Sequence, residues 1–116
     1  MLSALNRLRS SKDFARVTKT GHRATTASLV IYLKEDQSLQ AEPQIGLIVS
    51  KAIGGSVTRH RIARQLRHSA RELLTTIPPH SQMVVRAIAD NGDFKKDLQQ
   101  GIHKISQRIS GTGVKK

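Results

Sequence analysis

The chain has 116 residues, and 20 Lys and Arg against 8 Asp and Glu give it a formal net charge of +12. This length supports one domain, whose ends, about residues 1–8 and 111–116, we expect to be flexible. The absence of cysteine excludes disulfides, thiolate chemistry and cysteine-based metal sites. No apolar run approaches the roughly 18 residues of a membrane span, and arginines come too early for a signal peptide, so we expect a cytoplasmic protein.

The basic residues are unevenly spread along the chain. Residues 51–71 carry six basic and no acidic side chains, whereas residues 35–50 carry three acidic and no basic ones. A concentrated positive field attracts polyanions, so nucleic acid is the leading class of partner and an anionic membrane surface is second.

The N-terminal half is predicted to form a helix followed by strands. Ser10 is a hydroxyl cap ahead of an acidic first turn, and Gly21 is a natural stop, which predicts a short helix over residues 11–20. The strands expected from apolar and β-branched runs span residues 25–27, 28–34 and 45–50. The acidic, polar stretch 35–43 between the two longer strands is predicted to be a hairpin loop.

The C-terminal half is predicted to alternate helix, strand and helix. Ser56 can cap a helix over residues 57–75, whose apolar positions recur at helical spacing. Residues 83–89 predict a strand, and a turn with capping residues follows it. The last helix is expected over residues 93–109, with Gly111 as its stop.

The order helix, two or three strands, helix, strand, helix indicates the fold class. The strands of so short a chain must share one sheet, and the two striped helices would cover one of its faces. We therefore expect an α+β fold, a two-layer sandwich with one mixed sheet of three to four strands.

The helix predicted over residues 57–75 is amphipathic. Its apolar residues fall on one side of a helical wheel: Ile62, Leu66, Ala70 and Leu73. The opposite side carries four arginines and two histidines: Arg61, Arg64, Arg67, Arg71, His60 and His68. Only Glu72 is near enough in the sequence to neutralise them, and guanidinium groups match phosphate geometry, so this side predicts phosphate binding.

Two other interpretations of this helix stay open. A solvated polar face is common on amphipathic helices, although a typical one mixes both signs of charge. A helix that lies on a membrane surface is the second alternative, but here the apolar side is needed for the core and has no Trp or Phe.

The segment from Lys51 to Arg67, KAIGGSVTRHRIARQLR, resembles the signature of the bacterial ribonuclease P protein subunit. That signature is roughly Lys, two residues, Gly-Asn-Ala-Val, one residue, Arg-Asn-Arg, one residue, Lys-Arg, two residues and Arg. The upstream residues Arg7-Leu8 and the segment 13–17 are similar to the family's first helix, and the spacing of the two strands before Lys51 also fits. The chain departs from the family pattern at Gly55-Ser56, His60, Ala63 and, in the first helix, Thr18.

The resemblance implies a subunit that binds a large catalytic RNA, which removes the 5′ leader of precursor tRNA with Mg²⁺ held mainly by the RNA and the substrate. The protein itself is then expected to have no catalytic residue, no metal site and no small-molecule substrate. The residues implied to contact the catalytic RNA are Lys51, Arg59, His60, Arg61, Arg64, Arg67 and Arg71. The implied fold is α+β with a left-handed βαβ crossover.

A second surface is implied for the leader of precursor tRNA. Small RNA-binding proteins hold single strands by stacking bases on aromatic rings beside basic side chains. The resemblance implies that the leader lies between the first helix and the sheet, where Phe14 and Tyr32 match the family's aromatic positions. Val30 shares the face of Tyr32 by strand alternation, and Arg16 and Arg86 are expected to flank this face.

Two other functions stay open from the residues. A small structural RNA-binding protein, such as a ribosomal protein, would have the same basic charge. A self-sufficient ribonuclease would need a paired acid and base, but the five histidines are scattered, and His60 and His68 lie about 12 Å apart along their helix. The sequence contains no phosphate-loop or dinucleotide-binding motif.

Overall fold

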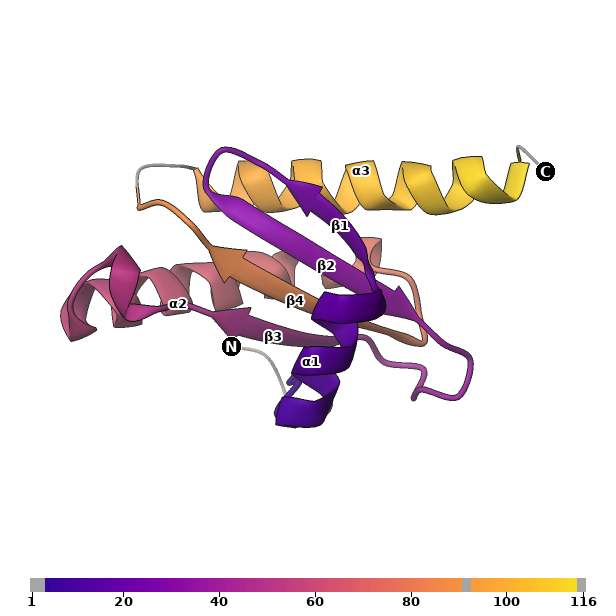
Figure 1. Cartoon of the computed structure of the whole chain (residues 1–116), viewed down its shortest axis with the longest axis horizontal. Coiled ribbons are helices and arrows are strands. Elements are labelled where there is room, and N and C mark those ends of the chain that lie inside the picture. Colours follow the sequence, from indigo (N-terminus) through magenta and orange to yellow (C-terminus); the bar gives the residue numbers. More distant parts are fainter. Residues whose placement is uncertain (1–3, 91–92, 115–116) are drawn as a thin grey trace.

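The computed structural model describes residues 4–90 and 93–114, and the described chain consists of helices and strands around one sheet (Figure 1). In chain order the elements are α1 (Ser11–Thr20), β1 (His22–Thr25), β2 (Leu29–Glu35), β3 (Gln44–Ile48), α2 (Ser56–Glu72), β4 (Ser81–Ala87) and α3 (Phe94–Val114). Short 3-10 turns span Ala4–Asn6, Lys51–Ile53 and Leu74–Thr76. Within the described ranges, no helix is long and apolar enough to cross a membrane.

The four strands form one mixed sheet in the order β1-β2-β4-β3. Strand β2 pairs antiparallel with β1 on one side and with β4 on the other, whereas β3 pairs parallel with β4. The α+β class and the mixed sheet are therefore confirmed.

The predicted hairpin between β2 and β3 is wrong, because β4 lies between these two strands. Residues 81–85 of β4 are all buried, which suits a central strand that is covered on both faces. The stretch 35–43 instead packs against the start of β4, where the His80 N–H donates to the Ala41 carbonyl over 3.1 Å. The last strand in the sequence thus enters the middle of the sheet, a non-local pairing that a turn signal does not reveal.

The connection from β3 through α2 to β4 is left-handed. In Figure 1 both strands run towards the left, β4 lies above β3, and α2 returns behind the sheet. Parallel crossovers are right-handed in about 98% of cases. The exception seen here is therefore a specific feature of the fold, and it agrees with the topology that the resemblance implies.

Helices α2 and α3 cover one face of the sheet, and α1 crosses the other. The main core, under α2 and α3, includes the fully buried Ile31, Val85, Ile62, Leu66 and Leu98. A smaller core under α1 joins Leu8, Val17 and Val84. Because α1 is short, Val30 and Ile48 on its side of the sheet stay partly exposed.

Residues 4–8 belong to the N-terminal region that we expected to be flexible, and they pack beside β3. Arg7 forms a parallel bridge with Ile45, and the Leu8 N–H donates to the Ile45 carbonyl over 3.0 Å. The Leu8 side chain is buried. Residues 1–3 and 115–116 of the expected flexible ends lie outside the described residues.

Several predicted element boundaries are wrong. Helix α2 ends at Glu72 rather than at residue 75, β4 spans Ser81–Ala87 rather than 83–89, and β3 spans Gln44–Ile48 rather than 45–50. Gly55 is the N-cap of α2, and Ser56 is the first helical residue rather than the cap. The short first strand lies earlier than predicted, over His22–Thr25, where it pairs with β2 directly after α1 ends. The last helix continues past Gly111 to Val114, because a glycine lowers the stability of a helix by about 1 kcal/mol but keeps the backbone N–H and C=O that the helix needs.

Candidate RNA interface

The outer side of α2 forms a cationic surface. The predicted amphipathic division is confirmed, since Ile62, Leu66 and Ala70 are buried in the main core. The basic side chains exposed on the outer side are His60, Arg61, Arg64, Arg67, His68 and Arg71. We call these six residues the α2 surface.

An acidic side chain from another element reaches the α2 surface, which corrects the expectation that only Glu72 is near. Arg61 donates to the Asp90 carboxylate, which follows β4, over 2.7 Å. The Glu72 carboxylate pairs with Lys95 of α3, whose Nζ lies 3.0 Å from Oε1, and its Oε2 lies 3.5 Å from Nε2 of His68. The hydrogen bond from Lys95 and its positive charge lower the pKa of the Glu72 carboxyl below the ordinary value of 4.5.

The positive charges of three arginines on the α2 surface are not neutralised by any described acidic side chain. Arg64, Arg67 and Arg71 form no hydrogen bond or ion pair with any residue that the structure describes. Like charges three or four residues apart on a helix repel one another. An anionic ligand laid over this surface would relieve that repulsion, which favours phosphate binding over a simple solvated face.

Side chains along this one helix border an open depression of the α2 surface. A concavity of about 780 Å³ is lined by Val57, His60, Arg61, Ala63, Arg64, Arg67 and His68. Val57 is 82% exposed at the start of the helix. An exposed apolar side chain beside guanidinium groups offers contact to the apolar part of a ribose or base as well as to phosphate.

The other two residues implied to contact the catalytic RNA lie at and before the start of α2. Lys51 is exposed in the turn Lys51–Ile53. Arg59 is half-buried, and its buried Nε atom has no hydrogen-bond partner within the described chain. The charges of Lys51 and Arg59 extend the positive field of the α2 surface towards the start of the helix.

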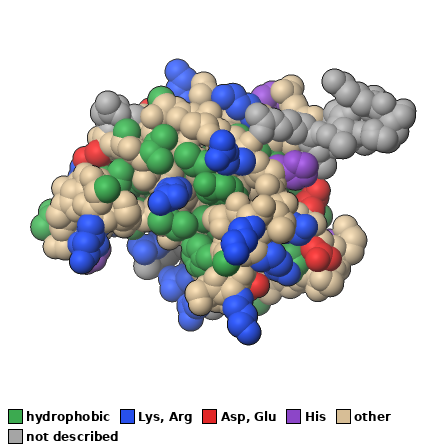
Figure 2. Space-filling view, viewed as in Figure 1, with side chains coloured by type: hydrophobic (Ala, Val, Ile, Leu, Met, Phe, Trp, Pro, Cys, Tyr) green, Lys and Arg blue, Asp and Glu red, His purple; other side chains and the backbone are tan. Residues whose placement is uncertain are grey.

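The sheet residues implied to contact the leader lie on one face, in two adjacent rows across the strands. The rows are Tyr32–Val84–Gly46 and Val30–Arg86–Ile48. Hydrophobic side chains gather at the centre of the molecular surface on this side, with Lys and Arg side chains around and among them (Figure 2). We call Phe14, Val30, Tyr32, Ile48 and Arg86 the sheet face.

Phe14 reaches the sheet face from α1. A Cβ atom added to Gly46 of β3 would lie only 2.3 Å from Cζ of the Phe14 ring, so the ring rests directly on the glycine backbone. The ring packs beside Val17 and Val84 of the smaller core and remains half-buried. Phe14 thus combines a packing role with a partly accessible aromatic surface.

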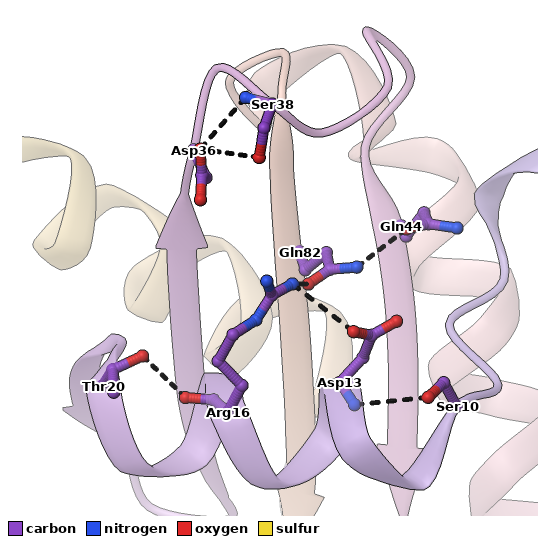
Figure 3. Close-up of polar contacts among 8 residues, drawn as sticks. All are labelled: Ser10, Asp13, Arg16, Thr20, Asp36, Ser38, Gln44 and Gln82. Atoms are coloured by element: carbon purple, nitrogen blue, oxygen red, sulfur yellow. Dashed lines mark hydrogen bonds and ion pairs between the residues drawn. The ribbon is translucent and has the colours of Figure 1, made fainter.

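Arg16 lies on the same side of the sheet, but its guanidinium is engaged within the protein. Its Nη2 donates to the Gln82 side chain and lies 3.4 Å from the Asp13 carboxylate (Figure 3). Gln82 in turn donates to the Gln44 side chain over 2.9 Å. This network ties α1 to β4 and β3, so Arg16 fixes the helix that carries Phe14.

Further basic residues lie near these surfaces, although the sequence predicts no RNA contact for them. Arg23 of β1 stands opposite Tyr32 and therefore lies on the same side of the sheet. Arg7 and Arg9 flank the buried Leu8 beside β3. The alternation basic, apolar, basic at residues 7–9 is the signal that could have identified this segment as an edge strand.

Metal-ligating side chains are scattered over the described part of the chain. They bring together no group of three or more His, Cys, Asp or Glu side chains that could hold a metal ion. The geometry instead offers cationic and aromatic contacts, which are the groups that bind RNA phosphates and unpaired bases.

Known proteins support the same interpretation. A family profile described as Ribonuclease P matches residues 2–110. The "Ribonuclease P protein component" of Mycobacteroides abscessus is 39% identical over 118 residues, which cover 93% of each chain. That of Streptomyces griseus is 38% identical and covers 99% of this chain and 100% of its own.

Solved structures share the fold. The RNase P protein of Staphylococcus aureus superimposes with a TM-score of 0.76 at 24% identity, over 88% of this chain and 95% of its own. That of Thermotoga maritima superimposes with a TM-score of 0.70 at 21% identity, over 81% and 92%. The fold, the extent of the profile match and the curated relatives agree, and the chain belongs to the ribonuclease P protein family.

Proposed function

We propose that this chain is the protein subunit of ribonuclease P, an endoribonuclease that processes tRNA in the cytoplasm. It binds a catalytic RNA through the α2 surface together with Lys51 and Arg59, and it binds the 5′ leader of precursor tRNA through the sheet face, with Arg16 at its margin. The observation that carries the proposal is the placement of two different RNA-type surfaces on two sides of one small sheet. Such a placement suits a protein that joins two RNA molecules.

In this proposal the RNA carries the catalysis and the protein positions the substrate. Mg²⁺ held by the RNA and the substrate would activate the attacking water. The α2 surface would place uncompensated guanidinium groups among RNA phosphates and lower the repulsion that metal ions must otherwise screen. The protein should therefore matter most when Mg²⁺ is scarce.

The test is cleavage of precursor tRNA at low Mg²⁺ by the catalytic RNA of a related bacterium, with and without the purified chain. We expect the chain to increase the rate of cleavage at the 5′ leader, with less increase at high Mg²⁺. If the chain leaves this rate unchanged and binds ribosomal RNA as well as it binds the catalytic RNA, it is a structural RNA-binding protein. Cleavage without added RNA would indicate a self-sufficient nuclease.

A further inference from the structure

A basic pocket lies at the outer edge of β3, between the two RNA surfaces. The bridge between Arg7 and Ile45 and the burial of Leu8 fix the alternation of the N-terminal segment, so Arg7 and Arg9 fall on the same side of it. The pocket has a volume of about 410 Å³. Its lining residues are Arg7, Leu8, Arg9, Phe14, Ile45, Gly46, Leu47 and Arg67.

The lining of this pocket has one sign of charge. It contains three arginines, and none of the described residues that line it is acidic. Arg9 and Arg67 form no hydrogen bond or ion pair with the described part of the chain, whereas Arg7 has other contacts. Guanidinium groups contributed by separate segments around one concavity favour a phosphate group there.

An aromatic ring is the second feature of the pocket. Phe14 forms part of the wall, and its ring is held against Gly46. A ring beside guanidinium groups is the combination that holds an unpaired nucleotide, because the base or ribose contacts the ring while the phosphate binds the cations.

We propose that this pocket is a third RNA-binding site, which takes the phosphodiester of an unpaired nucleotide between Arg9 and Arg67. The site rests on the proposed function and extends it. Arg67 belongs to the α2 surface and Phe14 to the sheet face, so an RNA strand can pass from one surface to the other around the edge of β3 along continuous positive charge. The phosphodiester comes from the leader or from the catalytic RNA.

Arg9→Gln tests the site, with Lys12→Gln as the matched control. Both side chains are exposed and both variants lose one charge, but Lys12 does not line the pocket. Each variant is titrated against the catalytic RNA alone, and each assembled complex against precursor tRNA and mature tRNA, over a series of salt concentrations. A phosphate contact on a single strand contributes about 0.7 to the salt slope, so we expect Arg9→Gln to lower that slope by about 0.7 and to weaken binding about fivefold near 0.1 M salt.

The pattern of the loss identifies the source of the phosphodiester. If Arg9→Gln weakens binding of precursor tRNA but not of mature tRNA, the phosphodiester belongs to the leader. If it weakens binding of the catalytic RNA, the phosphodiester belongs to the catalytic RNA. Arg9→Lys should restore part of the affinity. Equal effects of Arg9→Gln and Lys12→Gln on every RNA overturn the site, while stimulation of cleavage by the unmodified chain still upholds the proposed function. A chain that binds none of these RNAs overturns both.

Discussion

Tyr32 is the single residue that best tests the leader surface. It lies on β2 opposite Val84, and its half-buried ring packs against the smaller core and stays partly accessible. Stacking on an aromatic ring is worth roughly 1–3 kcal/mol per base, a factor of about 5 to 150 in affinity. By the family resemblance Thr18 takes the place of a second aromatic residue of the first helix, so we expect Tyr32→Ala to weaken precursor tRNA binding by the lower half of that range. Tyr32→Ala should bind mature tRNA, which lacks the leader, as well as the unmodified chain does. Tyr32→Phe, which keeps the ring, is the control variant and should bind precursor tRNA nearly as well as the unmodified chain.

Asp90 neutralises part of the positive charge of the α2 surface, because its carboxylate forms an ion pair with Arg61. We expect Asp90→Asn to steepen the salt slope of RNA binding by about one phosphate contact, since it releases a guanidinium and removes a repelling carboxylate. The pair is exposed, so the free energy of unfolding should change by less than about 1 kcal/mol. Glu35→Gln is the control because it removes an acid far from this surface in the sequence, and an equal slope in both variants would contradict a specific role for Asp90.

At the scale of elements, α3 lies unusually close to β2. A Cβ atom added to Gly101 would lie 2.0 Å from Cδ1 of Ile31, which is fully buried. Helix propensity alone would make Gly101→Ala stabilising by about 1 kcal/mol, but overpacking a core costs about 1–3 kcal/mol. We therefore expect Gly101→Ala to destabilise the protein in urea unfolding. In an Ile31→Val background, which removes Cδ1, the cost should shrink; an unchanged cost would mean that the backbone, not this contact, is responsible.

The pair between Glu72 and Lys95 joins α2 to α3 and makes stability depend on pH. The hydrogen bond from Lys95 lowers the pKa of the folded Glu72 carboxyl below 4.5. A lowered folded pKa means that the pair contributes stability above about pH 4.5 and that this contribution is lost as pH falls through the folded value. The melting temperatures of the unmodified chain and Glu72→Gln should therefore differ slightly at pH 7 and converge in acid. A constant difference would show that the carboxylate charge is not involved.

At the scale of the whole molecule, the two RNA surfaces should respond to different ligands. Arg64 is exposed and unpaired among the described residues, so Arg64→Ala should weaken assembly with the catalytic RNA and lower the salt slope while leaving the melting temperature nearly unchanged. Tyr32→Ala should weaken binding of precursor tRNA to the assembled complex and leave assembly with the catalytic RNA nearly unchanged. If both variants impair both RNAs equally, the two surfaces act as one general RNA-binding surface.

The sequence by itself determined what depends on neighbours along the chain. The cationic side of α2 and its buried stripe follow from a period of 3.6 residues, the common face of Val30 and Tyr32 follows from a period of two, and Ser10 caps α1 as predicted by accepting from the Asp13 N–H. The segment from Lys51 to Arg67 also carried the family resemblance. These features were predictable because each lies within one helix, one strand or one motif.

Only the tertiary structure decided which distant segments meet. The insertion of β4 between β2 and β3, the bridge from Arg7 to Ile45 and the pair between Arg61 and Asp90 all join residues well separated along the chain. No local period encodes them, because a strand's apolar pattern states which face is buried but not which strand lies beside it. The pocket at the edge of β3 exists only through such contacts, since the N-terminal segment, β3 and α2 build it together.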